Sequence, residues 1–399
     1  MPRKYRADQV GSFLRPLEVK EAHAAYAQGR LPLEELRRIE DAAILKLLDM
    51  QKQAGIDVYS DGEIRRGGWA SDFGDAVETG YVPGTPSVRL QFHENPLAAA
   101  WRESHPDSNI GVGPVGIAAG SAGAAVASSA ATGAGRVLGA PIRLKHPLTA
   151  HEAGFLKNHA PGPYKVTMPA PSYLVARAYN PEISDKAFGD RRGLLRAVAD
   201  VINAEIKALV AGGVPYIQLD NPHYPDYVVE ERRDQWHAIG IDPDRAVEED
   251  VEADNSCLRG FERSNVTLAM HFCRGNGGLG GWHTSGGYDR IAEPVFGHLD
   301  VDTFLEYDSE RAGTFEPLRF MQKGKTVVLG LVTTKSGQLE SEDLLRQRID
   351  EAAKYVPLDD LALSPQCGFA STFQGNPLTE EEQRRKLELV VETARKVWR

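Results

Sequence analysis

The sequence predicts an α/β fold and, within that class, a single (β/α)8 TIM barrel over residues 1–399. Its length and its hydrophobic content of 42% allow one large barrel or roughly two to three smaller domains. Strand-like apolar runs alternate with helical patterns about eight times, which is typical of a parallel sheet covered by helices. Residues with metal-binding or acid–base side chains follow several of these runs. A barrel gathers such strand ends at one mouth, whereas an open doubly wound sheet would not readily gather so many around one point.

The N-terminal part begins with a short strand at Asp8 that runs into a turn at Gly11 and Ser12. Apolar residues at helical spacing predict a helix over 32–54, and Gly55 is suited to end it. A strand over 56–60 follows. The segment 111–136 is dominated by Gly, Ala and Ser, so we expect a flexible insert or flap within the barrel domain. An alanine-rich helical segment is the alternative.

The rest of the chain shows a regular alternation of strand and helix patterns. Thr149 is suited to cap the first of these helices. The predicted strands are 137–144, 164–168, 214–219, 266–271, 301–305, 326–332 and 358–363, and the predicted helices are 149–159, 191–211, 246–261 and 379–398.

Composition and charge argue against several classes of function. The net charge is −10, and no run rich in Lys or Arg occurs, so nucleic-acid binding is not expected. No apolar stretch reaches the ~18–20 residues that span a bilayer, and the N-terminus lacks the apolar core of a signal peptide. Three cysteines are too few for a disulfide framework and fit a reducing compartment. We therefore expect a cytoplasmic protein with no membrane or nucleic-acid partner; a homo-oligomer is compatible with the sequence.

Four residues near strand ends form a plausible zinc site. His271 and Cys273 are two apart at the end of an apolar run, so their side chains point to the same side. Glu306 and Cys367 follow two other strand-like runs. Imidazole, thiolate and carboxylate are all zinc ligands, and catalytic zinc sites keep a position for substrate. The alternative is a hydrogen-bonded histidine with two cysteines packed as small apolar side chains.

Other residues near strand ends suit an amino acid that carries a thiol. A thiol bound to zinc loses its proton near neutral pH and becomes a nucleophile. Glu63 and Asp220 could hold an ammonium group, and backbone N–H groups at Gly11 and Ser12 could hold a carboxylate. A solvated Glu63 and a plain turn at Gly11–Ser12 are the alternatives.

Seven segments together resemble the cobalamin-independent methionine synthase family, in particular its catalytic C-terminal barrel and the shorter "methionine synthase II"-type proteins. They are residues 10–16, 61–63, 217–220, 271–273, 305–308, 330–335 and 363–369. The resemblance implies one zinc held by His271, Cys273, Glu306 and Cys367. It also implies that Glu63 and Asp220 bind the amino group of homocysteine, and that Gly11 and Ser12 receive its carboxylate. The family reaction moves a methyl group from a 5-methyl-tetrahydrofolate to the homocysteine thiolate, giving methionine.

The sequence also departs from this family. The second, N-terminal barrel of the long enzymes has no counterpart here, which leaves the folate donor open beside a corrinoid protein. Lys335 stands where the long enzymes carry a proton-donating histidine, so it is the candidate proton donor. The tryptophan that stacks on the pterin has no clear match, and Tyr173 lies in that area.

Two other functions remain open. Short relatives include epoxyalkane:coenzyme M transferases, which would need basic residues for a sulfonate, and Arg65, Arg66 and Arg274 are candidates. A barrel that stores or senses zinc or a thiol is the non-enzymatic alternative, but the presence of a substrate-binding set beside the metal set argues against it.

Overall fold

The computed structural model describes residues 4–105, 135–277 and 279–398. Six parallel strands form one sheet in chain order. They are β3 (Lys165–Pro169), β4 (Tyr216–Asp220), β5 (Thr267–Phe272), β6 (Asp302–Glu306), β7 (Val327–Val332) and β8 (Leu361–Pro365). All six are rich in buried residues, as expected of a parallel sheet covered on both faces.

Two short N-terminal segments close this sheet into a ring. Ala7 forms a parallel bridge with Leu363 of β8, and Tyr59 forms one with Tyr164 next to β3. The two segments meet each other where the amide of Asp57 donates to the carbonyl oxygen of Ala7 at 3.0 Å. The ring therefore has eight positions, six of them regular strands, and the predicted (β/α)8 barrel is confirmed.

The barrel interior is packed with side chains. A buried apolar cluster, separate from the main core, draws residues from the N-terminal segments and from five of the strands: Tyr5, Val10, Val58, Tyr216, Ala269, Phe304, Val328 and Ala362. The buried ammonium of Lys165 lies 2.6 Å from Asp8 Oδ1 and within 4.7 Å of the ring centres of Tyr216 and Phe304. The lumen is thus filled, and the open space lies at the strand ends.

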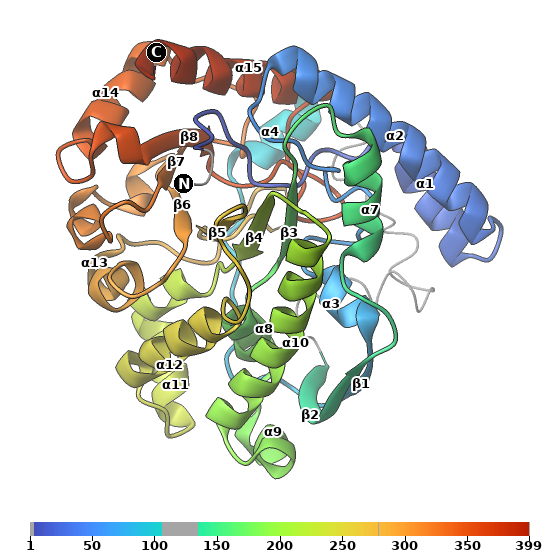
Figure 1. Cartoon of the computed structure of the whole chain (residues 1–399), viewed down its shortest axis with the longest axis vertical. Coiled ribbons are helices and arrows are strands. Elements are labelled where there is room, and N and C mark those ends of the chain that lie inside the picture. Colours follow the sequence, from blue (N-terminus) through green and yellow to red (C-terminus); the bar gives the residue numbers. More distant parts are fainter. Residues whose placement is uncertain (1–3, 106–134, 278, 399) are drawn as a thin grey trace.

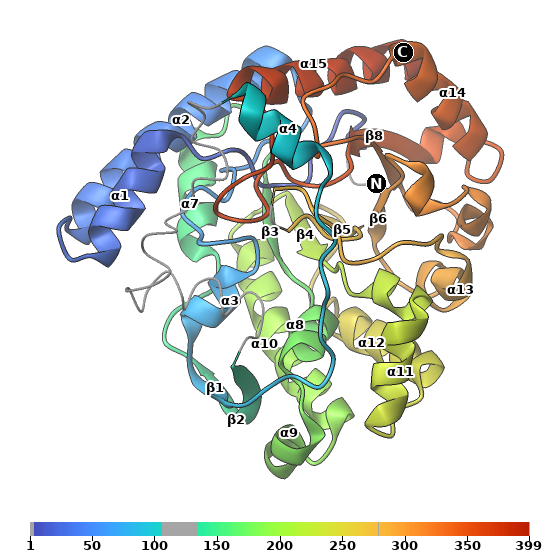
Figure 2. The ribbon, with the colours of Figure 1, turned by 180° about the vertical axis from the view of Figure 1, so that it is seen from behind.

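Helices surround the strands (Figures 1 and 2). The helix α2 (Leu33–Ala54) ends at Gly55, which adopts the left-handed conformation with φ 82°. The last helix, α15 (Glu380–Val397), begins with a capping box between Thr379 and Glu382. The other α-helices within the described residues are α1 (Leu17–Ala27), α3 (Ser71–Ala76), α4 (Leu97–Ser104), α7 (Ala150–His159), α8 (Pro171–Ala178), α9 (Pro181–Phe188), α10 (Arg191–Ala211), α11 (Glu230–Ala238), α12 (Pro243–Ser256), α13 (Asp289–Ile291) and α14 (Glu342–Ala352).

Two local predictions need correction. The strand predicted at 137–144 forms as β2 (Arg136–Leu144), but it pairs antiparallel with β1 (Val77–Pro83) outside the barrel (Figure 1). Only Val137 and Leu138 of β2 are buried, and the other residues are half-buried or exposed, as expected of a ribbon with a solvated face. Thr149 does precede α7, but its hydroxyl makes no cap and instead donates to the buried carboxylate of Glu205 at 2.8 Å.

The predicted insert lies mostly outside the described residues. Of the segment 111–136, only Gly135 and Arg136 belong to the described part, where Arg136 begins β2. Within the described residues, no helix has the length and apolar character needed to cross a membrane.

Candidate functional site

Three of the four predicted metal ligands meet at the mouth of the barrel. The ligand atoms of His271, Cys273 and Cys367 lie within 4.8 Å of one another, and all three residues are buried. His271 belongs to β5, Cys273 follows its last residue, and Cys367 lies two residues beyond β8. The alternation of side chains along β5 therefore directs both of its ligands toward Cys367.

The side chains of this cluster shift one another's pKa values through hydrogen bonds. Nδ1 of His271 lies 3.2 Å from Asp220 Oδ1. Burial lowers the pKa of His271, but its hydrogen bonds to Asp220 and Cys367 outweigh burial and raise the pKa to about 10. A hydrogen bond from Cys273 holds the pKa of Cys367 well below its usual value. Burial opposes this effect, and His271 adds to it. The same bond to Cys367, together with burial, raises the pKa of Cys273. Two thiols and an imidazole close together in a buried site are a suitable donor set for a soft divalent metal, which binds in exchange for their protons.

The fourth predicted ligand, Glu306, does not join this cluster. It is fully buried at the end of β6, where Arg311 Nη2 donates to its Oε1 at 2.6 Å. The amide of Arg274 donates to Oε2, also at 2.6 Å. Burial opposes ionisation, but Lys335, Arg274 and Arg311 lower the pKa of Glu306. Glu306 is thus an anionic carboxylate near Cys273 whose oxygens are occupied by arginine and backbone donors.

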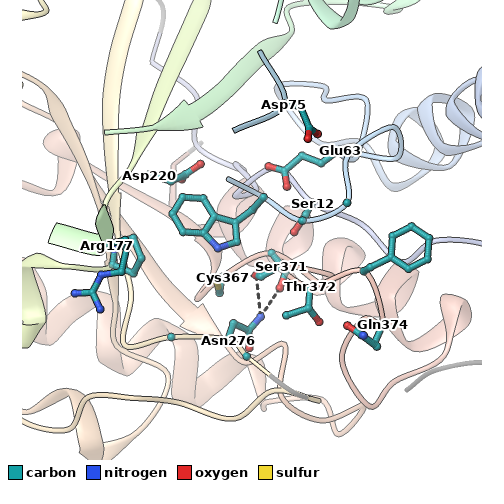
Figure 3. A pocket seen from close by; sticks show the side chains of 18 of the residues that line it. Ser12, Glu63, Asp75, Arg177, Asp220, Asn276, Cys367, Ser371, Thr372 and Gln374 are labelled. Atoms are coloured by element: carbon teal, nitrogen blue, oxygen red, sulfur yellow. Dashed lines mark hydrogen bonds between the residues drawn. The ribbon is translucent and has the colours of Figure 1, made fainter. Parts of the chain in front are cut away.

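Three of the four predicted substrate residues line one cavity with the metal cluster, and Gly11 does not. This cavity has a volume of about 1030 Å³, and its wall includes Ser12, Glu63 and Asp220 as well as the three cluster residues. Figure 3 shows Glu63, Ser12 and Asp220 around a common space, with Cys367 beside Ser371 on one wall. The structure therefore brings together residues from the first and last parts of the chain.

Glu63 is held in a strained and incompletely paired state. Its φ of 55° is in the left-handed region, which residues other than glycine rarely adopt. Thr167 Oγ1 donates to its Oε1 at 2.8 Å, whereas its Oε2 is buried and has no partner among the described residues. Burial, opposed by Arg66 and aided by Asp220, raises the pKa of Glu63 to about 8. Strain and an unpaired buried acceptor are typical of residues that wait for a ligand.

The predicted turn at Gly11 and Ser12 is closely packed against this carboxylate. Gly11 has φ 144°, and a Cβ there would lie 2.8 Å from Thr167 Cγ2 and 3.0 Å from Glu63 Oε1. On the other side, a Cβ on Gly368 would lie only 1.9 Å from Ser12 Oγ. Glycine is required at both positions for the N-terminal turn to approach Glu63 and the Cys367 loop.

Lys335, the predicted proton donor, forms hydrogen bonds to the loop that follows Cys273. Its buried ammonium donates to the carbonyl oxygen of Gly275 at 2.9 Å and to Asn276 Oδ1 at 3.0 Å. It is not among the described residues that line the cavity. In this structure Lys335 therefore holds the loop that follows Cys273.

Sequence reasoning overlooked several residues of the cavity wall. Trp69 lies in the wall and packs against Tyr173, with 4.6 Å between ring centres. His283 also lines the cavity and contacts Asp226, with 3.0 Å between Nδ1 and Oδ1. Neither Trp69 nor His283 lies in a strand-end motif, so only the neighbouring Gly-rich stretches could have pointed to them. Tyr173, placed near the site by sequence, does line the cavity.

The three arginines considered for a sulfonate are already engaged. Arg65 pairs with Asp41, and Arg66 with the buried Glu152. Arg274 donates to the carbonyl oxygen of Gly286 at 2.7 Å. Each guanidinium thus has acceptors within the protein.

Comparisons with known proteins agree with this architecture. Residues 6–88 and 185–396 match the family described as "Cobalamin-independent synthase, Catalytic domain". The uncharacterized protein YxjH of Bacillus subtilis is 36% identical over 398 residues, which cover 99% of this chain and 95% of YxjH. The methionine synthase of Saccharolobus solfataricus is 23% identical over 94% of this chain and 95% of its own length.

Two solved structures share the whole fold. A Listeria monocytogenes protein superposes with a TM-score of 0.68 at 26% identity, covering 100% of this chain and 99% of its own. The second is a B12-independent methionine synthase from Shewanella sp. W3-18-1 in complex with selenomethionine. It superposes with a TM-score of 0.65 at 21% identity, covering 99% of this chain and 98% of its own.

Proposed function

Because this chain belongs to the family of the cobalamin-independent methionine synthase catalytic domain, we propose that it is a zinc-dependent methyltransferase that converts homocysteine to methionine. The observation that carries the proposal is the position of Glu63. Its unpartnered carboxylate oxygen lies in the wall of the same cavity as the His271–Cys273–Cys367 cluster. A buried acceptor beside a thiol-binding cluster suits a substrate with both an ammonium group and a thiol.

The cavity favours an amino acid over a sulfonate. Glu63 and Asp220 both line it; the carboxylate of Asp220 would repel a sulfonate, and Glu63 offers no positive charge to bind one. The candidate sulfonate partners Arg65, Arg66 and Arg274 already have acceptors. Coenzyme M is therefore the less suitable thiol, and an epoxyalkane:coenzyme M transferase is the weaker alternative.

His271, Cys273 and Cys367 would hold the zinc, with Glu306 as the fourth ligand once it leaves Arg311. Bound zinc lowers the pKa of a coordinated thiol and so supplies a thiolate near neutral pH. Asp220 orients the imidazole of His271 through Nδ1, as carboxylates commonly do for metal-bound histidines.

The other site residues would position the amino acid. Glu63 and Asp220 receive its ammonium group, and the Gly11–Ser12 turn receives its carboxylate. The Shewanella protein, which shares the fold, binds selenomethionine, an analogue of the product of this reaction. The methyl donor is a 5-methyl-tetrahydrofolate or a corrinoid protein, and the aromatic pair Trp69 and Tyr173 offers a stacking surface to a flat ring.

Zinc content and zinc-edge X-ray absorption test this proposal directly. We expect one zinc per chain whose spectrum gains a sulfur ligand when homocysteine is added, and no such change with coenzyme M. The spectrum of the substrate-free protein also tests Glu306 as the fourth ligand. With Glu306 bound, we expect two sulfur ligands, one nitrogen ligand and one carboxylate oxygen ligand. Zinc that keeps its ligands in the presence of homocysteine would overturn the acceptor assignment.

A further inference from the structure

A second group of titratable side chains, which shares no residue with the metal cluster, reaches the cavity wall through Arg177 and His283. It centres on Asp226 in the 3-10 helix η1 (Tyr224–Val228), whose carboxylate is fully buried. Arg177 Nη2 donates to Asp226 Oδ2 at 2.8 Å, and His223 Nδ1 lies 3.2 Å from the same oxygen. His283 Nδ1 lies 3.0 Å from Oδ1, and Thr284 Oγ1 donates to Oδ1 at 2.9 Å. None of these residues has a role in holding the metal or the amino acid.

The bond to Asp226 fixes the protonation pattern of the His283 ring. An ionised carboxylate only accepts hydrogen bonds, so Nδ1 of His283 must carry a hydrogen. Asp226 is ionised, because His283 and Arg177 outweigh burial and hold its pKa well below the usual value. The second nitrogen, Nε2, makes no hydrogen bond within the described part of the chain. His283 therefore has one nitrogen anchored and the other available.

The available nitrogen lies next to the loop that follows Cys273. His283 lines the cavity, and its ring packs against Gly275, two residues after Cys273. A Cβ on Gly275 would lie 2.3 Å from His283 Cδ2 and 2.9 Å from Nε2, so only glycine allows this approach. The edge of Phe92 covers the ring, with 5.3 Å between ring centres. The imidazole is thus held in one orientation at the wall of the cavity.

We propose that His283 donates the proton that the leaving group of the methyl donor needs, with Asp226 as its positioning residue. The inference rests on the proposed function and concerns an N-methyl donor of the tetrahydropterin class. The thiolate sulfur forms the new S–C bond with its electron pair, and the C–N bond of the donor breaks. That bond's electron pair stays on the nitrogen, which takes the proton from His283 Nε2. The neutral imidazole then regains a proton from solvent.

Geometry favours His283 over Lys335 for this step. The ammonium of Lys335 donates to Gly275 and Asn276, and Lys335 is not among the described residues that line the cavity, whereas His283 is. Histidine is also the side chain that most often transfers protons in enzymes. A carboxylate that holds the distal nitrogen stabilises the imidazolium form.

A comparison of two methyl donors isolates the proton-transfer step. 5-Methyltetrahydrofolate needs a proton on its leaving nitrogen, whereas methyl iodide releases iodide without one. In the zinc-loaded protein, we expect His283→Gln to lower methylation of homocysteine from 5-methyltetrahydrofolate by about 10²–10⁴-fold. Methylation from methyl iodide should be unchanged. Asp226→Asn should show a smaller loss with the same donor dependence.

Matched controls make the result decisive. His23→Gln removes another cavity-lining histidine, one that pairs with Glu40, and should not alter either rate. Equal losses with both donors, or no loss, in His283→Gln would overturn the inference. A donor-specific loss in Lys335→Met with none in His283→Gln would assign the proton to Lys335 instead. Wild-type protein that uses methyl iodide but no N-methyl donor would overturn this inference and leave the thiol chemistry intact, whereas inactivity with both donors would overturn the proposed function.

Discussion

Asp220 Oδ1 lies 3.2 Å from His271 Nδ1, so a carboxylate that we propose binds the substrate also contacts a proposed metal ligand. Gln218 Nε2 donates to the same Asp220 oxygen at 2.7 Å, and this second hydrogen bond fixes the carboxylate. The two binding functions therefore share one hydrogen-bonded chain from β4 to β5. Occupation of the metal site should orient Asp220 for the amino group, and the following predictions treat metal binding and substrate binding separately.

Cys367→Ser should abolish stoichiometric zinc binding. The substitution removes one of the two sulfur atoms of the cluster and leaves a hydroxyl, which is a much poorer zinc ligand. Cys257→Ala is the matched control, because Cys257 is equally buried but donates to the carbonyl oxygen of Asp254 outside the cluster. Elemental analysis of both purified variants measures the effect. Full zinc occupancy in Cys367→Ser would contradict the assignment of this ligand.

Glu63→Gln should weaken homocysteine binding without affecting zinc. A hydrogen bond to a charged group contributes about 1.5–3 kcal/mol, so KM should rise by roughly 10–100-fold. Homocysteine that lacks its amino group, 4-mercaptobutyrate, provides the control, since its binding does not use the carboxylate charge. Isothermal titration of both ligands against wild type and variant gives the comparison. A similar loss for the two ligands would show that Glu63 does not bind the ammonium group.

The stability of the ligand-free protein should fall with pH through the titration of Glu63. Burial raises the pKa of this residue from 4.5 to about 8. The unfolded chain releases the proton near pH 4.5, whereas the native protein keeps it until about pH 8. The stabilising contribution is therefore complete below the unfolded pKa and is lost as pH rises through the folded pKa, at a total of about 3–5 kcal/mol.

Urea unfolding of wild type and Glu63→Gln at about pH 5 and about pH 8.5 measures this contribution of Glu63 to the free energy of unfolding. The variant should gain stability relative to wild type at the higher pH, because a neutral amide has no proton to lose. Asp61, Asp72 and Asp254 also have pKa values raised by burial and act in the same direction, but their effects cancel in the difference. A difference that does not change with pH would contradict the prediction.

Gly368→Ala should disrupt the site through Ser12. The added Cβ would lie 1.9 Å from Ser12 Oγ and 3.1 Å from Ser12 Cβ, so the turn that faces the substrate must move. We expect a destabilisation of about 1–3 kcal/mol and weaker homocysteine binding. Gly154→Ala is the control: a Cβ there meets nothing within 4 Å in α7, so it should be neutral or stabilising by up to about 1 kcal/mol. Calorimetry and ligand titration distinguish the two variants. Unchanged stability and unchanged homocysteine affinity in Gly368→Ala would show that the turn can shift freely.

Much of the fold and half of the site geometry follow from local sequence patterns. The helical periodicity of residues 33–54 with Gly55 after them gives α2 almost to the residue. The period of two along a strand places His271 and Cys273 on one side, and the motif after β8 supplies Cys367. These inferences succeed because helix and strand geometry is set by near neighbours in the chain. The same patterns did not show that 137–144 pairs outside the barrel, since strand periodicity carries no information about the partner.

The tertiary structure alone decided which groups face each other and in what state. It closes the ring through single bridges at Ala7 and Tyr59; the sequence predicts short strands in these two segments but not their partners. It pairs Glu306 with Arg311, and it directs the ammonium of Lys335 to the carbonyl oxygen of Gly275. It also joins His283 to Asp226 across 57 residues. Such contacts, and the desolvation that raises the pKa of Glu63, arise from packing between segments distant in sequence, so no local pattern of residues could have determined them.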